Sequence, residues 1–239
     1  MKKTVATTLC LMALGAIALA DVYVKVTTHT DAYYTGGVPH PATDRTTEIW
    51  MCQNRLATIT PARHLIVDEP AKTLTIVFPG EKTYLVAPLP LEMNKLVDEA
   101  VYPMLQAYQT LGTVAAGSKT DRIGPWECRS YTAEVSGPTP LEITFWCTAG
   151  VPFDWRRMDR LQLPMRRLAN YSEEYIRALE MVQGIPVLTE VTVFLQGMSF
   201  NSTSRVVEIE EKPAPPTVYT VPEDFTRKDR LSIEDLRRR

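Results

Sequence analysis

The sequence predicts a mainly β protein of the α+β class, in which a single curved antiparallel sheet forms a half-open barrel with two helical insertions as its lid. Three observations predict this fold. About ten or eleven segments alternate apolar and polar residues, as half-buried strands do. Turns rich in Pro and Gly separate these segments. The spacing of apolar residues becomes helical only near residues 93–111 and 155–182, which predicts two helical insertions. A two-sheet sandwich would need no such insertions.

Short strands are expected throughout the first half of the chain. They include residues 45–52 and 55–60, which Gln53-Asn54 joins as a hairpin, and residues 64–68 and 83–87. In several strands the apolar positions lie on one side, so they should face a common interior. These inward-facing residues are Val22, Val24, Val26, Ile49, Met51, Leu74, Ile76 and Phe78.

The first helical insertion is expected to begin near Met93. Leu96, Val97 and Val101 then recur at the spacing of an amphipathic helix, so they should cover the mouth of the barrel. Pro103 is expected to end or kink this helix, with a second helical piece at residues 104–111.

Strands return after the first insertion. Residues 113–121, 126–135 and 141–147 should pair as hairpins, and the last of these places Ile143 and Phe145 on one face. The second helical insertion is expected to break near Pro164 and to begin again at Ser172.

The last long strands follow the second insertion. Val191, Val193 and Leu195 alternate with polar residues and form another inward-facing set, and residues 197–202 are expected as a turn region. The folded domain should span residues 21–222, with a short edge segment at 218–221. Residues 223–239 form a charged tail that is expected to be mobile or weakly helical.

Three cysteines follow residue 20: Cys52, Cys128 and Cys147. An oxidising compartment permits one disulfide and leaves one thiol over. A hairpin centred near residue 138 would bring Cys128 close to Cys147, so these two are the expected pair, and closing such a loop stabilises a fold by about 3 kcal/mol. The alternative is that all three are small buried apolar residues.

Residues 1–20 have the form of a cleavable secretory signal. Lys2-Lys3 gives a positive start, residues 4–19 carry no charge, and Ala18-Leu19-Ala20 has the small-x-small pattern of a cleavage site. The uncharged run is shorter than the ~20 residues that a spanning helix needs, and Cys10 lies inside it rather than at the cleavage point. We therefore expect a periplasmic protein without a lipid anchor or a stable membrane anchor, an uncleaved anchor being the alternative.

The charge of the chain is close to balanced, with 28 acidic and 26 basic residues. A nucleic-acid-binding protein would normally show a basic stripe. The basic clusters here are short, namely Arg156-Arg157 with Arg166-Arg167 and residues 237–239, and they are expected to be solvated. No nucleic-acid partner is therefore expected.

Several longer segments carry a resemblance to known proteins. They are EIWMCQNRLATIT at 48–60, LIVDEPAKTLTIVFPGEKTYLVAPL at 65–89, IGPWECRSYTAEV at 123–135, ITFWCTAGVPFD at 143–154 and YTVPEDFTRKD at 219–229. Together with the layout of the elements, they resemble the LolA/LppX-like superfamily of exported lipoprotein and lipid carriers. They resemble more closely an exported bacterial family of unknown function that is expected to share its half-open barrel. The resemblance implies a fold and a lipid-like class of ligand, although this chain lacks a lipobox and has a charged tail.

Motifs for catalysis or metal binding are missing from the sequence. His29, His40 and His64 lie far apart, and no CxxC, HExxH or HxH pattern occurs. The segment Gly197 to Asn201 lacks the second glycine of a nucleophile elbow. We therefore expect no enzyme activity, no cofactor and no metal.

The functional hypothesis is a carrier or chaperone that binds a hydrophobic ligand inside the barrel, such as a lipid or an acylated protein. Its expected binding residues are Val24, Val26, Ile49, Met51, Leu74, Ile76, Phe78, Leu96, Val97, Val101, Val191, Val193 and Leu195. The alternative is that these residues form a packed core. The protein would then be an interaction module that binds an envelope protein partner and no small molecule.

Overall fold

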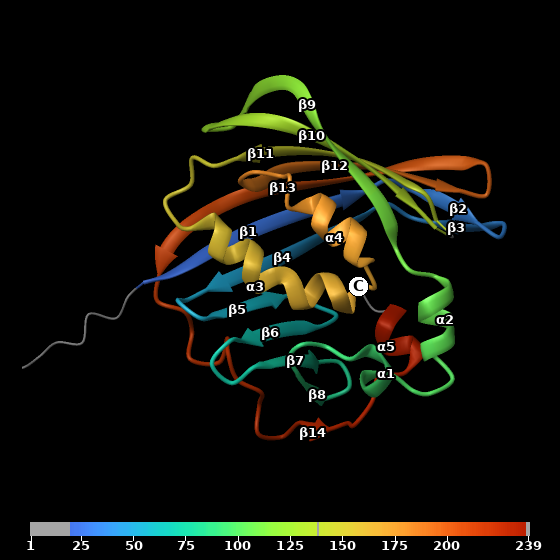
Figure 1. The fold of residues 1–239 in the computed structure, drawn as a ribbon, viewed down its shortest axis with the longest axis vertical. Coiled ribbons are helices and arrows are strands. Elements are labelled where there is room, and N and C mark those ends of the chain that lie inside the picture. Colours follow the sequence, from blue (N-terminus) through green and yellow to red (C-terminus); the bar gives the residue numbers. More distant parts are fainter. Residues whose placement is uncertain (1–19, 138, 238–239) are drawn as a thin grey trace, which may run out of the picture.

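The computed structural model describes residues 20–137 and 139–237. Its main feature is one curved, open sheet of 12 strands in the order β14-β8-β7-β6-β5-β4-β1-β13-β12-β11-β10-β9 (Figure 1). The strands are β1 (Asp21–Thr30), β4 (Thr43–Met51), β5 (Arg55–Ile59), β6 (His64–Asp68), β7 (Thr73–Phe78), β8 (Thr83–Pro88), β9 (Leu111–Ile123), β10 (Trp126–Ser136), β11 (Leu141–Thr148), β12 (Ile185–Leu195), β13 (Met198–Lys212) and β14 (Thr226–Arg227). Neighbouring strands are antiparallel except β14 and β8. The single curved sheet expected from the sequence is therefore confirmed.

The sheet consists of two series of hairpins that meet at β1. Strands β4 to β8 pair in chain order, and so do β9 to β13. β1 pairs with β4 on one side and with β13 on the other, so that Val24 faces Ile49 and Ile209 in the register. A small separate hairpin of β2 (Tyr33–Thr35) and β3 (Val38–His40) extends beyond the end of β1.

The helices lie within two insertions and at the C-terminal end of the chain. They are α1 (Met93–Leu96), α2 (Tyr102–Ala107), α3 (Trp155–Leu168), α4 (Glu173–Leu179) and α5 (Ile233–Arg237). Figure 1 shows α3 lying across β1, β4 and β5, with α4 beside it and α1, α2 and α5 grouped near one end of the sheet. The two helical insertions expected from the sequence are thus present on one face of the sheet.

The half of the sheet made by β5 to β8 carries much of the main core. Leu56, Leu74 and Phe78 are at most 1% exposed, and they belong to one cluster with Leu161 of α3 and with Val97. Each strand contributes alternate apolar residues to this face, as the sequence predicts. Burial of these large apolar side chains stabilises this half of the fold.

The opposite face of this half-sheet has its own apolar layer. Tyr23, Trp50, Ile66 and Val77 are buried there with Val218. Residues 218–221, expected as an edge strand, instead belong to a turn-rich segment that covers this outer face. The alternation pattern could not separate these cases, because an apolar turn segment on a sheet and an edge strand both bury one or two side chains.

The helical boundaries differ from the sequence expectation. Val97 leaves the helical path and forms a parallel bridge with Leu231, which divides the expected helix into α1 and α2. Pro103 lies in the first turn of α2, where its missing N–H costs nothing, instead of ending a helix. Pro164 lies inside a continuous α3, which buries Leu161 and Leu168 on either side of it. Ser172 caps α4 as expected, since its Oγ accepts a hydrogen bond from the Tyr175 amide at 3.1 Å.

The charged C-terminal segment is part of the fold. β14 pairs with β8, and Leu231 is 1% exposed in the main core. The Lys228 ammonium donates to Asp235 at 2.9 Å and to Glu81 at 3.1 Å. Burial opposes ionisation of Asp235, but the Ser232 amide and Lys228 outweigh it and hold the pKa of this carboxyl below its usual range. Residues 223–237, expected as a mobile or weakly helical tail, thus include the short helix α5 and the buried Leu231. An isolated buried leucine among charges gives no periodic signal, so the sequence pattern did not indicate this contact.

The expected disulfide is absent from the described structure, where Cys52, Cys128 and Cys147 are free thiols. The β10–β11 hairpin that should bring them together is present, but Cys147 lies opposite Arg129 and not opposite Cys128. Cys128 and Cys147 are both buried, and burial raises the pKa of the Cys147 thiol to about 12. The alternative of small buried apolar residues describes these two, while Cys52 is half-buried.

Candidate ligand cavities on the concave face

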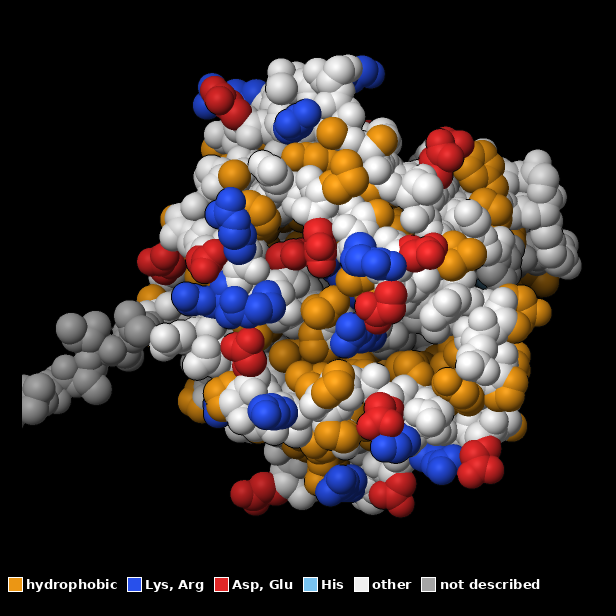
Figure 2. Space-filling view, viewed as in Figure 1, with side chains coloured by type: hydrophobic (Ala, Val, Ile, Leu, Met, Phe, Trp, Pro, Cys, Tyr) orange, Lys and Arg blue, Asp and Glu red, His pale blue; other side chains and the backbone are white. Residues whose placement is uncertain are grey.

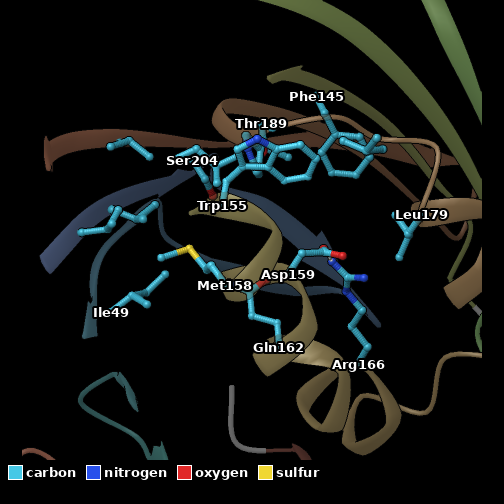
Figure 3. A pocket seen from close by; sticks show the side chains of 17 residues that line it. Ile49, Phe145, Trp155, Met158, Asp159, Gln162, Arg166, Leu179, Thr189 and Ser204 are labelled. Carbon is cyan, nitrogen blue, oxygen red and sulfur yellow. Dashed lines mark hydrogen bonds and ion pairs between the residues drawn. The ribbon is translucent and has the colours of Figure 1, made fainter. Parts of the chain in front are cut away.

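A cavity of about 210 Å³, partly open to solvent, lies between α3 and the concave face of the sheet (Figure 3). Val24, Val26 and Ile49 form part of its floor, and Trp155 and Met158 of α3 form part of its roof. The roof residues recur at helical spacing along α3, so one face of the helix looks into the cavity. α3 also packs near β5 and β6, where its Leu161 and Leu168 belong to the main core, and this packing holds the helix in place above the sheet.

One edge of this cavity is polar. Asp159, Gln162 and Arg166 follow one another along the same face of α3 and point into the cavity (Figure 3). Arg166 forms an ion pair with Asp159, and their side chains are 18% and 40% exposed. The rest of the lining is mostly apolar, so the cavity is an apolar slot with a single charged pair at one side.

A second and wider cleft of about 710 Å³ lies over the other half of the sheet. Ile143, Val191 and Phe200 are among the residues of its floor. Its walls include Leu105 of α2 and Ile233 of α5. Exposed apolar side chains stand near its rim, among them Tyr108 at 58% and Leu111 at 47%. Figure 2 shows this face of the molecule, on which apolar surface is interspersed with acidic and basic side chains around the helices.

The cavity and the cleft lie end to end on the same three strands. Phe145, Thr189 and Ser204 are cross-strand neighbours and line the cavity. The row two residues further along consists of Ile143, Val191 and Ser202, and it lines the cleft. Residues two apart share a face and lie about 6.8 Å from each other along a strand. We call the cavity and the cleft together the concave channel.

The binding residues named from the sequence fall into three groups. One group is buried in the core and lines neither part of the channel: Met51, Leu74, Ile76, Phe78, Leu96, Val97 and Val101, together with Val22. A second group, Val24, Val26 and Ile49, lines the cavity. A third group, Val191 and Val193, lines the cleft. Leu195 is half-buried and lines neither. The structure therefore brings five of these residues to the channel.

Several channel residues were not foreseen. Phe145 was placed on an apolar strand face but not in a site, and Phe200 fell in a segment expected to be a turn. That segment belongs to β13, and the turn before it is formed by Gln196 and Gly197, which have positive φ angles. Arg166 was expected to be solvated with its neighbours, but it points into the cavity.

Two other kinds of feature, metal-ligand clusters and membrane-spanning helices, do not occur among the described residues. Residues 20–137 and 139–237 contain no group of three or more His, Cys, Asp or Glu side chains arranged to hold a metal ion. No helix in this part of the chain has both the length and the apolar character that crossing a membrane requires. The expected signal at residues 1–20 lies, apart from Ala20, outside the described residues.

Comparisons with known proteins give likenesses of fold. No family model matches the chain, and no curated protein matches its sequence. An uncharacterized conserved protein from Thermus thermophilus aligns over 90% of this chain and 91% of its own, with 7% identity and a TM-score of 0.42. A putative outer membrane lipoprotein-sorting protein domain from Vibrio parahaemolyticus aligns over 82% and 87%, with 6% identity and a TM-score of 0.31. At TM-scores below 0.5, neither likeness carries an inference about ligand or activity.

Proposed function

We propose that this protein binds one elongated apolar ligand along the concave channel and passes it on without changing it chemically. The observation that carries the proposal is the end-to-end placement of the cavity and the wider cleft on β11, β12 and β13. The cavity alone, at about 210 Å³, is smaller than the ~300–1,000 Å³ typical of ligand pockets. A ligand that continues into the cleft would use both.

The energetics suit a chain-like ligand. Each methylene group that moves from water into the channel contributes about 0.8 kcal/mol. The cleft opens beside the short helices α2 and α5, which gives such a ligand a route in and out. The export signal expected at residues 1–20 would place this activity in the periplasm, where a lipid or an acylated protein is the natural source of the ligand.

The packed-core alternative describes only half of the molecule. In β5 to β8 inward-facing residues such as Leu56, Leu74 and Phe78 are buried in a packed core, as an interaction module would require. Over β11 to β13, the same kind of alternating pattern surrounds open space. This contrast favours a ligand-binding role for the second half of the sheet.

A matched pair of variants on β13 tests the proposal. Val206 is 5% exposed and lines the cavity, whereas the next residue, Val207, is 49% exposed and faces outward. In Val206→Phe the new ring should enter the cavity, and in Val207→Phe it should remain in solvent. A ring that displaces about two methylene groups of ligand would cost about 1.6 kcal/mol, or roughly tenfold in Kd.

The measurement is the fluorescence of phenylnaphthylamine, a neutral apolar probe whose emission rises in apolar sites. We expect binding by the wild-type protein and by Val207→Phe, and binding at least about tenfold weaker by Val206→Phe. Mass spectrometry of organic extracts from the natively purified protein would identify a ligand carried through purification. The proposal fails if the wild-type protein does not bind the probe, or if both variants bind it equally well.

A further inference from the structure

The two adjacent arginines at the C-terminal end of α3 have different surroundings. Arg167 lies about 100° around the helix from Arg166, and its guanidinium donates through two nitrogens to Glu173, at 3.1 and 3.3 Å. Arg166 faces the cavity, and its hydrogen bond to Asp159 uses only Nη2. Among the described residues, Asp159 is the one carboxylate that pairs with Arg166. Two nitrogens of the Arg167 guanidinium are therefore hydrogen-bonded to a carboxylate, whereas only one nitrogen of the Arg166 guanidinium is.

A guanidinium carries five N–H donors in a rigid plane that fits carboxylate and phosphate groups through two parallel hydrogen bonds. Arg166 presents this group at the edge of an apolar cavity, and its side chain is only 18% exposed. A cation in apolar surroundings is costly unless it is paired and its donors are satisfied. An acidic group of a ligand could therefore accept hydrogen bonds from the remaining N–H donors of Arg166.

The position of Asp159 would allow another anion to displace it from Arg166. Its side chain is 40% exposed, so its carboxylate can turn toward water when another anion takes Arg166. It lies two helical turns before Arg166 on the same helix, so a change of side-chain rotamer is enough in principle to separate the two groups. The Arg166–Asp159 ion pair thus balances the charge of Arg166 in the empty cavity. When the two side chains separate, the Arg166 guanidinium is left available to an anion.

We propose that the ligand is an anionic amphiphile, whose carboxylate or phosphate group binds Arg166 in place of Asp159 while its apolar chain lies in the concave channel. This inference rests on the proposed function and adds the chemical class of the ligand. It assigns Arg166 as the head-group residue, Asp159 as its competitor, and the apolar lining around Trp155 and Met158 as the place where the chain lies.

The test is displacement of phenylnaphthylamine by three compounds with the same chain, used below their micelle-forming concentrations: dodecanol, dodecanoate and dodecyl phosphate. The proteins are wild type, Arg166→Gln, Asp159→Asn and the matched control Arg167→Gln. We expect Arg166→Gln to bind the two anions at least about tenfold more weakly and dodecanol as wild type does, because a hydrogen-bonded charge pair is lost only for the anions. Asp159→Asn should bind the anions more tightly, and Arg167→Gln should match wild type.

The outcomes separate this inference from the proposed function. Dodecanol binding shows that each variant is folded and has an open channel. If dodecanol and the anions bind alike, and neither Arg166→Gln nor Asp159→Asn alters that ratio, the head-group assignment is wrong while the apolar channel stands. If none of the three compounds displaces the probe, the channel itself is wrong. A preference for dodecanoate or for dodecyl phosphate in the wild type would show whether the natural head group is a carboxylate or a phosphate.

Discussion

Replacement of Leu231 by alanine tests whether the C-terminal segment is part of the folded core. Leu231 is 1% exposed, its amide donates to the Leu96 carbonyl at 2.8 Å, and its carbonyl accepts from the Asp98 amide at 3.0 Å. Alanine keeps both backbone hydrogen bonds, so the variant removes only the buried side chain. A buried Leu→Ala change costs about 2–5 kcal/mol, since the lost transfer free energy is joined by the energy of the cavity that remains.

Thermal unfolding followed by circular dichroism measures this effect. At about 2–4 °C per kcal/mol for a chain of this size, a loss of about 3 kcal/mol lowers Tm by roughly 6–12 °C. Leu111→Ala is the control, because Leu111 is 47% exposed and its truncation should change stability by no more than about 0.5 kcal/mol. If Leu231→Ala melted within experimental error of Leu111→Ala, the segment would not be docked in solution, and the reasoning from burial would be refuted.

Three further predictions concern single groups. Because the pKa of Asp235 is lowered in the fold, its carboxylate stabilises the protein above its unfolded pKa of about 3.9, and this stability is lost as the pH falls through the lower folded pKa. Urea midpoints of wild type and Asp235→Asn should therefore differ at pH 7 and converge in acid. Gly184→Ala should lower Tm more than Gly197→Ala: both glycines have positive φ, but only at Gly184 would a Cβ collide with a backbone carbonyl, that of Thr148. Equal losses would show that this contact relaxes freely. Iodoacetamide at pH 8 should modify Cys52 before Cys147, whose pKa burial raises to about 12, and mass spectrometry of labelled peptides would reveal any reversal of that order.

Alternation of apolar and polar residues was sufficient to predict the sheet and the direction that its side chains face. Val24 and Ile49 lie opposite each other on the concave face, because a period of two fixes which side of a strand each residue takes. The same pattern could not fix the helix boundaries. Val97 fits a helical stripe, but its bridge to Leu231, far along the chain, prevails over local periodicity.

The site was less predictable than the fold. A strand pattern shows which face is apolar, but the placement of helices decides whether that face is filled, as at Leu74, or left hollow, as at Val191. Helical periodicity alone also cannot tell which of two consecutive arginines points inward, since they are about 100° apart around the axis. The burial of Leu161 and Leu168 of α3 in the main core sets the rotation of the helix, and that rotation places Arg166 in the lining of the cavity.

The position of β1 has a consequence for how the chain assembles. In each of the two series, strands that follow one another along the chain pair with each other, so most contacts are local; β11 and β12, which α3 and α4 separate, are the exception. The strand that joins them is made near the start of the chain, yet one of its two partners ends at Lys212. Pairing over such a separation is slow, because the loop must close before any of its hydrogen bonds form. The two halves of the sheet must therefore remain separate until nearly the whole polypeptide is available, however early its first strand emerges.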